Sequence, residues 1–133
     1  MKKVKDAMTK NVKTISPSAT MAEAARIMKK NRIGCLVVAE GSKPVGIITE
    51  RDIAYKIVAE EKSSDTAVKE IMTKDLKTID KEKTLKDAAR IMAAHVIRRL
   101  LVVENKELIG IITLEDIMKA EKIGENAQLY SYT

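Results

Sequence analysis

The chain has 133 residues, of which 45% are hydrophobic and 33% are charged, a balance that is typical of a soluble globular protein. No apolar run approaches the roughly 18 residues of a membrane span, and the first residues lack the apolar stretch of a signal peptide. The single cysteine, Cys35, excludes a disulfide framework and a cysteine metal site, and we expect a cytoplasmic protein. Because Phe and Trp are absent, the core must consist of aliphatic side chains and methionine.

The formal net charge is +6, and the excess of Lys and Arg lies in residues 1–64, whereas residues 65–133 are balanced. A basic half of this kind favours anionic partners, which include nucleotides, nucleic acids and membrane surfaces. Charge alone does not choose among these partners.

The chain contains an internal repeat, because it matches itself without a gap when it is shifted by 64 residues. Roughly half of the positions from 4 to 53 are identical to their partners, and a fixed period of this kind takes precedence over local predictions. The strongest matches pair 4–15 with 68–79, 24–28 with 88–92, and 46–53 with 110–117. We therefore divide the chain into a first repeat, 1–62, a second repeat, 65–123, and a tail, 124–133.

The first repeat predicts five elements in chain order. Thr20 and Glu23 have the spacing of a capping box, which marks the start of a helix. Apolar residues then recur at helical spacing, and two apolar runs separated by a turn indicate a β-hairpin. The predicted elements are an extended segment at 12–15, a helix at 21–30, strands at 35–40 and 45–49, and a helix from about Glu50.

The second repeat predicts the same order, with a capping box at Thr84 and Asp87. Its elements are an extended segment at 76–79, a helix at 85–94, strands at 100–105 and 109–113, and a helix from about Leu114. Each repeat alone is too short to bury a good core, so we expect the two to pack face to face. The predicted fold class is α/β (α+β): two β-α-β-β-α repeats related by a pseudo-two-fold axis, which would create two equivalent clefts.

Each repeat ends its second strand with Thr-x-x-Asp, at Thr49 and Asp52 and again at Thr113 and Asp116. One interpretation is a helix cap, because the spacing is that of a capping box. The alternative is a ligand site, because ligands of α/β proteins commonly bind at the carboxyl ends of strands. An Asp at this place would repel phosphate but could accept hydrogen bonds from a ribose diol, which points to a nucleoside.

Three residues before each motif Thr lies a glycine, which is Gly46 in the first repeat and Gly110 in the second. The missing side chain would allow another group to approach the strand closely. The methionines that recur with the repeat are expected to fill the core.

The segments VKDAMTKNVKTISP, AARIMKKNRIGCLVV and PVGIITERDI, present as a tandem pair, resemble cystathionine-β-synthase (CBS) domains paired as a Bateman module. The resemblance covers about residues 1–123. It implies a β-α-β-β-α fold for each repeat and adenine nucleotides or related adenosyl ligands bound in the clefts between repeats. It also implies a free-standing, non-catalytic sensor that forms a homodimer and acts on a separate partner protein.

The resemblance assigns roles to individual residues. The ribose-binding positions are Thr49, Asp52, Thr113 and Asp116. The adenine-lining positions are Val12, Ile33, Ile47, Leu76, Ile97 and Ile111, and the phosphate-binding positions are Arg51, Arg98 and Arg99. By the same analogy, Arg98 and Arg99 serve the cleft of Asp52, and Arg51 serves the cleft of Asp116. Each arginine could equally be a solvated surface cation.

The two clefts are not expected to be equal, because the repeat is broken at the phosphate-binding positions. Arg98 and Arg99 stand where the first repeat has Gly34 and Cys35, and Glu115 stands where it has Arg51. Glu115 would oppose a phosphate.

AMP is the leading ligand, with ADP, ATP, S-adenosylmethionine and NAD as alternatives that the sequence does not separate. The second hypothesis is a basic module that binds nucleic acid or a protein without a physiological nucleotide, although aromatic platforms for single strands are absent. We expect no enzymatic activity, because one His, one Cys and no metal-ligand cluster leave no convincing nucleophile–base pair. His95 is expected at a helix C-terminus, either as a polar end residue or as a phosphate contact.

Overall fold

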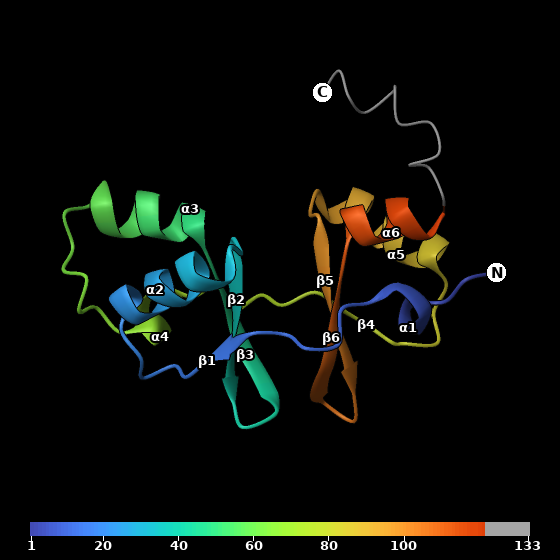
Figure 1. The fold of residues 1–133 in the computed structure, drawn as a ribbon, viewed down its shortest axis with the longest axis horizontal. Helices are drawn as coiled ribbons and strands as arrows, with labels where there is room; N and C mark the ends of the chain where they lie inside the picture. The colour runs from blue at the N-terminus through green and yellow to red at the C-terminus, as the bar shows by residue number, and fades with distance from the viewer. Residues whose placement is uncertain (122–133) are drawn as a thin grey trace, which may run out of the picture. The chain divides into compact units, whose positions relative to one another are not determined.

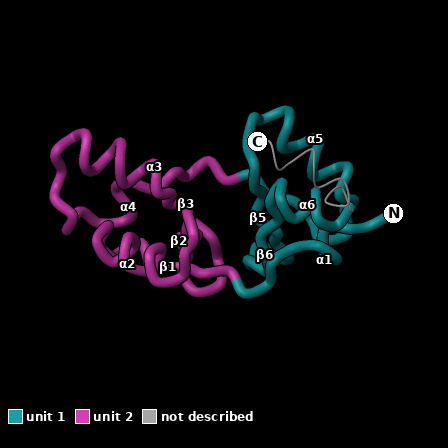
Figure 2. Tube along the Cα trace, turned by 45° about the horizontal axis from the view of Figure 1, so that its top comes forward, with its two compact units in different colours: residues 1–11, 77–133 teal, residues 12–76 magenta. Residues whose placement is uncertain are grey.

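The computed structural model describes residues 1–121, and the predicted elements appear in the predicted order, joined by two short additional helices (Figure 1). The chain forms two compact units (Figure 2). Unit 2 comprises Val12–Leu76, and unit 1 comprises Met1–Asn11 together with the chain from Lys77 onward. The predicted tail, 124–133, and the last two residues of the second repeat lie outside the described residues.

Unit 2 is built on a three-stranded sheet with helices against one of its faces (Figure 1). Its strands are β1 (Thr14–Ile15), β2 (Cys35–Glu40) and β3 (Lys43–Thr49). Strand β1 pairs parallel with β2, and β2 pairs antiparallel with β3, as the predicted hairpin requires. Its helices are α2 (Met21–Asn31), α3 (Glu50–Asp52), the π-helical η1 (Ile53–Val58) and α4 (Val68–Ile71).

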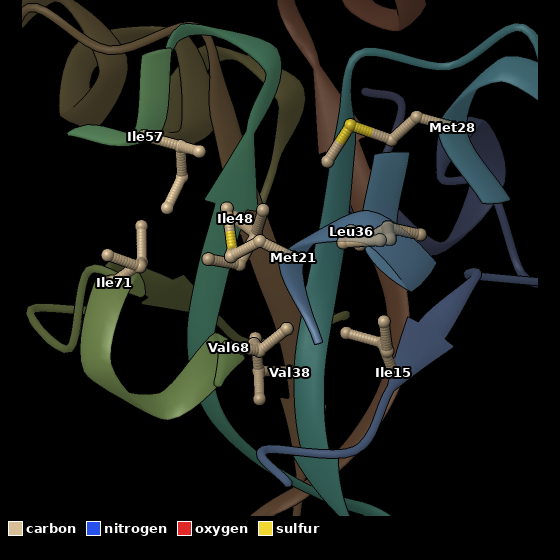
Figure 3. Close-up of a cluster of buried hydrophobic side chains, with 10 residues drawn as sticks. Ile15, Met21, Met28, Leu36, Val38, Ile48, Ile57, Val68 and Ile71 are labelled. Atoms are coloured by element: carbon tan, nitrogen blue, oxygen red, sulfur yellow. The ribbon is translucent and has the colours of Figure 1, made fainter. Parts of the chain in front are cut away.

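The core of unit 2 lies between the sheet and these helices (Figure 3). Helix α2 begins after Thr20, whose Oγ1 accepts a hydrogen bond from the Glu23 backbone amide at 3.1 Å. Helical spacing then turns Met21 and Met28 to one side, where they are buried. Strand residues that alternate toward the same side complete the cluster: Leu36, Val38 and Ile48.

Unit 1 repeats this plan, with a sheet in the order β4, β5, β6. Its strands are β4 (Thr78–Ile79), β5 (Arg99–Glu104) and β6 (Glu107–Thr113), and its helices are α1 (Val4–Ala7), α5 (Leu85–His95) and α6 (Leu114–Ala120). The pairing is again parallel and then antiparallel. The predicted α+β class and the β-α-β-β-α order are therefore confirmed.

The two compact units do not coincide with the sequence repeats, because the opening segments are exchanged. Helix α1, from the first repeat, belongs to unit 1, where the Val4 amide donates to the Lys83 carbonyl at 2.8 Å. Helix α4, from the second repeat, belongs to unit 2, where the Val68 amide donates to the Ala19 carbonyl at 2.8 Å. Each unit therefore contains residues from both repeats.

The motif glycines make room for these exchanged segments. A Cβ at Gly46 would lie 2.5 Å from the Met72 sulfur, and a Cβ at Gly110 would lie 2.7 Å from the Met8 sulfur. Directly after each methionine, a threonine exchanges two backbone hydrogen bonds with the motif strand, Thr73 with Ile47 and Thr9 with Ile111, at 2.9–3.0 Å. The group that approaches the strand closely is therefore a methionine of the protein itself.

Candidate functional site

The first Thr-x-x-Asp motif is a complete capping box at the junction of β3 and α3. The Thr49 amide donates to Asp52 Oδ2 at 2.8 Å, and the Asp52 amide donates to Thr49 Oγ1 at 3.2 Å. The Asp52 side chain is buried, with 7% of the residue surface exposed. Its second oxygen, Oδ1, lies 3.1 Å from Lys56 Nζ, so both carboxylate oxygens are engaged.

The second motif has the same capping box but a different second oxygen. The Thr113 amide donates to Asp116 Oδ2 at 2.9 Å, and the Asp116 amide donates to Thr113 Oγ1 at 3.1 Å. Within residues 1–121, Asp116 Oδ1 accepts no hydrogen bond and forms no ion pair. The residue that corresponds to Lys56 is Ala120, which cannot supply the missing cation. Capping therefore uses one oxygen of each Asp and leaves the other available for a second role only at Asp116.

The predicted adenine-lining residues are divided between the units. Unit 2 contains Val12, Ile33, Ile47 and Leu76, and unit 1 contains Ile97 and Ile111. Ile33 lines a cavity of about 460 Å³ beside the first motif, together with Gly34, Glu50 and Ile53. Ile47 is half-buried in the middle of β3, and Ile111 is buried at the matching place in β6.

The predicted phosphate-binding arginines lie next to the motifs, in unlike surroundings. Arg98 Nη2 donates to Glu115 Oε1 at 2.8 Å, within unit 1. Arg99 begins β5 and is paired in the sheet with Thr113. Arg51 lies over the ring of Tyr55, with its guanidinium carbon 5.9 Å from the ring centroid. Among the described residues Arg51 has no carboxylate partner.

Glu115 carries a negative charge at neutral pH. A hydrogen bond from its own backbone amide, followed by the contact with Arg98, lowers the pKa of its carboxyl. The ion pair is nevertheless exposed, since the Arg98 and Glu115 side chains have 70% and 57% of their surfaces exposed. Its contribution to folding stability is therefore small, in the range of about 0–1 kcal/mol for surface pairs.

Two of these contacts were missed from the sequence. Lys56 is four residues after Asp52 in a helical stretch, a spacing that could have indicated the ion pair. Arg98 and Glu115 are 17 residues apart, and no local pattern signals their contact.

Directly after Asp52 the helix widens to the π form, with the Ala59 amide donating to the Ala54 carbonyl at 2.9 Å, whereas α6 after Asp116 remains α-helical.

The other two residues considered from the sequence, His95 and Cys35, lie outside both Thr-x-x-Asp motifs. His95 is exposed at the last position of α5, and Cys35 is half-buried at the start of β2. Across residues 1–121, His, Cys, Asp and Glu side chains form no group of three or more that could hold a metal ion. In the same part of the chain, every helix is too short or too polar to cross a membrane.

Known proteins resemble this chain along most of its length. The family model described as CBS domain matches twice, at residues 4–59 and 68–123. A curated relative, the CBS domain-containing protein YhcV of Bacillus subtilis (strain 168), is 39% identical over 127 residues, which cover 96% of this chain and 91% of YhcV.

Solved structures agree with this relationship. An uncharacterized conserved protein from Pyrococcus horikoshii has a TM-score of 0.82 at 33% sequence identity, and the match covers 90% of this chain and 92% of that one. The CBS domain pair of protein MJ0100, in complex with 5′-methylthioadenosine and S-adenosyl-L-methionine, has a TM-score of 0.81 at 32% identity, with 92% and 97% covered. Because the CBS domain model matches this chain twice, the chain is a tandem member of the CBS domain family.

Proposed function

We propose that the chain is a non-catalytic regulatory module that senses an adenosyl ligand through its Thr-x-x-Asp motifs. The supporting observation is the open carboxylate oxygen of Asp116, which stands at the end of β6 while the other oxygen caps α6. An ionised carboxylate is an acceptor of hydrogen bonds, and a ribose diol offers two hydroxyl donors. Thr113 and Asp116 are half-buried, so a sugar bound there would be partly removed from water.

The nature of the ligand is supported by a relative. The CBS pair of MJ0100 binds 5′-methylthioadenosine and S-adenosyl-L-methionine, two ligands that share an adenosyl group. We place AMP beside these two as a candidate, with ADP, ATP and NAD as larger alternatives. In this chain the adenine would lie against aliphatic side chains such as Ile97 and Ile111, because Phe and Trp are absent from the sequence.

Regulation would follow from differential affinity. A ligand that binds one conformation or one association state more tightly shifts the population toward it, by no more than the difference in binding free energy. The two states would differ in the homodimer that the chain forms or in its complex with a separate target protein.

Thermal unfolding with a ligand panel tests this proposal. The panel is 5′-methylthioadenosine, S-adenosylmethionine, AMP, ADP, ATP and NAD, and the proteins are the wild type and an Asp52→Asn/Asp116→Asn double variant. Asparagine keeps one oxygen for the capping amide but replaces the second acceptor by an NH₂ donor. A ligand at 100 times its Kd should stabilise the wild type by about 2.7 kcal/mol, and the double variant should lose this response.

Asp87→Asn is the matched control, because Asp87 forms an equivalent capping box with Thr84 at the start of α5. It should change the melting temperature slightly and leave the ligand response intact. If no member of the panel shifts the wild type at millimolar concentration, the motifs are helix caps and the adenosyl-sensor proposal is wrong.

A further inference from the structure

The contact between Arg98 and Glu115 bears on which adenosyl ligands the second motif accepts. Both residues are fixed next to that motif by the backbone, because the Leu114 amide donates to the Arg98 carbonyl at 2.9 Å and Glu115 is the residue directly before Asp116. Their side chains meet at 2.8 Å. The guanidinium that lies beside the second motif is thus already paired with a carboxylate of the same unit. The family analogy gave Arg98 to the cleft of Asp52 and Arg51 to the cleft of Asp116, whereas the contacts within each unit support the reverse pairing.

A phosphate at this place would face two electrostatic obstacles. It would have to displace Glu115 from Arg98, because both anions compete for the same guanidinium donors. After displacement, the carboxylates of Glu115 and Asp116 would remain as adjacent like charges. A ligand whose 5′ group is uncharged or cationic meets neither obstacle.

The first motif has the opposite arrangement. Gly34 stands in place of Arg98, and Arg51 stands in place of Glu115. Arg51 contacts the ring of Tyr55, and no described carboxylate neutralises it. The residue directly before the motif Asp is therefore an available cation in the first repeat and an anion in the second, whereas the residue before that is Glu50 in the first repeat and Leu114 in the second.

We infer that Glu115 is a specificity-determining residue, which holds Arg98 as an internal counter-ion and makes the Thr113–Asp116 site prefer adenosyl ligands without a 5′-phosphate. This inference rests on the proposed function, because it concerns the 5′ group of a ligand whose ribose is bound by Asp116. It assigns the ligand class by charge: 5′-thioethers and sulfonium compounds over nucleoside phosphates.

The test compares two ligands that share adenosine and differ at the 5′ position, 5′-methylthioadenosine and AMP. Isothermal titration is performed on the Asp52→Asn protein, which keeps the full ribose acceptor only at the second motif, with and without Glu115→Gln. Glu115→Gln should tighten AMP binding by roughly fivefold, the scale of one exposed charge interaction, and leave 5′-methylthioadenosine unchanged. Glu115→Arg, which copies Arg51, should tighten AMP further.

Two controls isolate the cause. Glu107→Gln makes the same charge change at the opposite end of β6 and should leave the ratio of the two Kd values unchanged. Arg98→Ala combined with Glu115→Gln should abolish the gain for AMP, because the freed guanidinium is then missing.

An unchanged Kd ratio in Glu115→Gln overturns the inference and leaves the proposed function standing, and so does a gain for AMP that survives Arg98→Ala. If neither ligand binds the wild type, the proposed function fails and the inference fails with it.

Discussion

The two Thr-x-x-Asp motifs have the same backbone geometry and different electrostatic surroundings. In both, the Thr amide donates to Asp Oδ2 at 2.8–2.9 Å and the Asp amide donates to the Thr hydroxyl at 3.1–3.2 Å. Near the first motif are Lys56 and Arg51, which has no carboxylate partner within residues 1–121, and near the second motif are Ala120 and Glu115. Duplication has thus kept the helix cap and changed the charges that a ligand would meet.

This difference shows what the motif alone can and cannot indicate. The capping interpretation and the ligand interpretation are compatible, because the cap occupies a single carboxylate oxygen. A carboxylate can accept up to about four hydrogen bonds, so the second oxygen is the one that decides. Its partners come from residues outside the motif, which differ between the repeats.

The largest expected effect is a loss of folding stability when the motif glycines are replaced. Both repeats should lose stability, and the second repeat should lose more. Gly110→Ala places a Cβ 2.7 Å from the Met8 sulfur and 3.0 Å from the Thr9 carbonyl oxygen, whereas Gly46→Ala contacts side-chain atoms of Met72. Overpacking of this kind costs about 1–3 kcal/mol, and Gly110→Ala should cost more because a backbone atom cannot rotate away. Urea unfolding measures both variants. Negligible losses in both variants would contradict the close approach, and equal losses would contradict the predicted order of the two.

A second contrast lies at the C-terminal ends of helices α2 and α5. Val96 after α5 and Arg32 after α2 both adopt left-handed backbone angles, with φ of 53° and 54°. This conformation is unfavourable for a β-branched residue, and Val96 is 91% exposed, so its side chain contributes little packing. Val96→Gly should stabilise the protein by about 1 kcal/mol, and Arg32→Gly by less. The readout is the melting temperature, and a destabilised Val96→Gly would show that the side chain packs in a way that its exposure hides.

The Lys56–Asp52 pair allows the two motifs to be interchanged. Ala120→Lys places a cation four residues after Asp116, as Lys56 is after Asp52. It should weaken 5′-methylthioadenosine binding at the second motif by roughly threefold, because the open oxygen becomes paired. Lys56→Ala should strengthen ligand binding at the first motif. Lys69→Ala, the control, removes the same charge and should have no such effect. If titration calorimetry showed no effect of Ala120→Lys on 5′-methylthioadenosine binding, this prediction would be wrong.

The smallest expected effect is a pH dependence that belongs to unit 1. Hydrogen bonds from Lys3 and Lys5 lower the pKa of Glu82 to about 2, from an ordinary value of 4.5. Because the folded pKa is depressed, the contacts stabilise the fold fully above about pH 4.5 and lose this contribution as the pH falls toward 2. The first repeat has Ser18 at the corresponding position and lacks such a group. The stability difference between wild type and Glu82→Gln should therefore be small, screened by salt, and absent near pH 2 in acid titrations.

Much of the fold could be predicted from the sequence, because the signals are local. The capping boxes at Thr49, Thr84 and Thr113 and the apolar runs of the hairpins fix where helices and strands begin. The exchange of α1 and α4 could not be predicted. Both are four-residue helices, too short for a periodic signal, and their place is set by hydrogen bonds to distant residues such as Lys83 and Ala19.

The candidate site divides in the same way. The Thr-x-x-Asp positions could be identified because they repeat, and the changed residues at 51 and 115 predict that the two sites are unequal. The partners of those residues were hidden, since Arg98 reaches Glu115 through the fold rather than along the chain. The roles that the resemblance assigns to the adenine-lining and phosphate-binding residues stay predictions.

Titration calorimetry with 5′-methylthioadenosine on the wild type, Asp52→Asn and Asp116→Asn tests the central claim most directly. If the two motifs are unequal ligand sites, Asp116→Asn should remove the tighter binding of this uncharged ligand, and Asp52→Asn should retain it. Equal losses in the two variants, or no loss in either, would contradict the account.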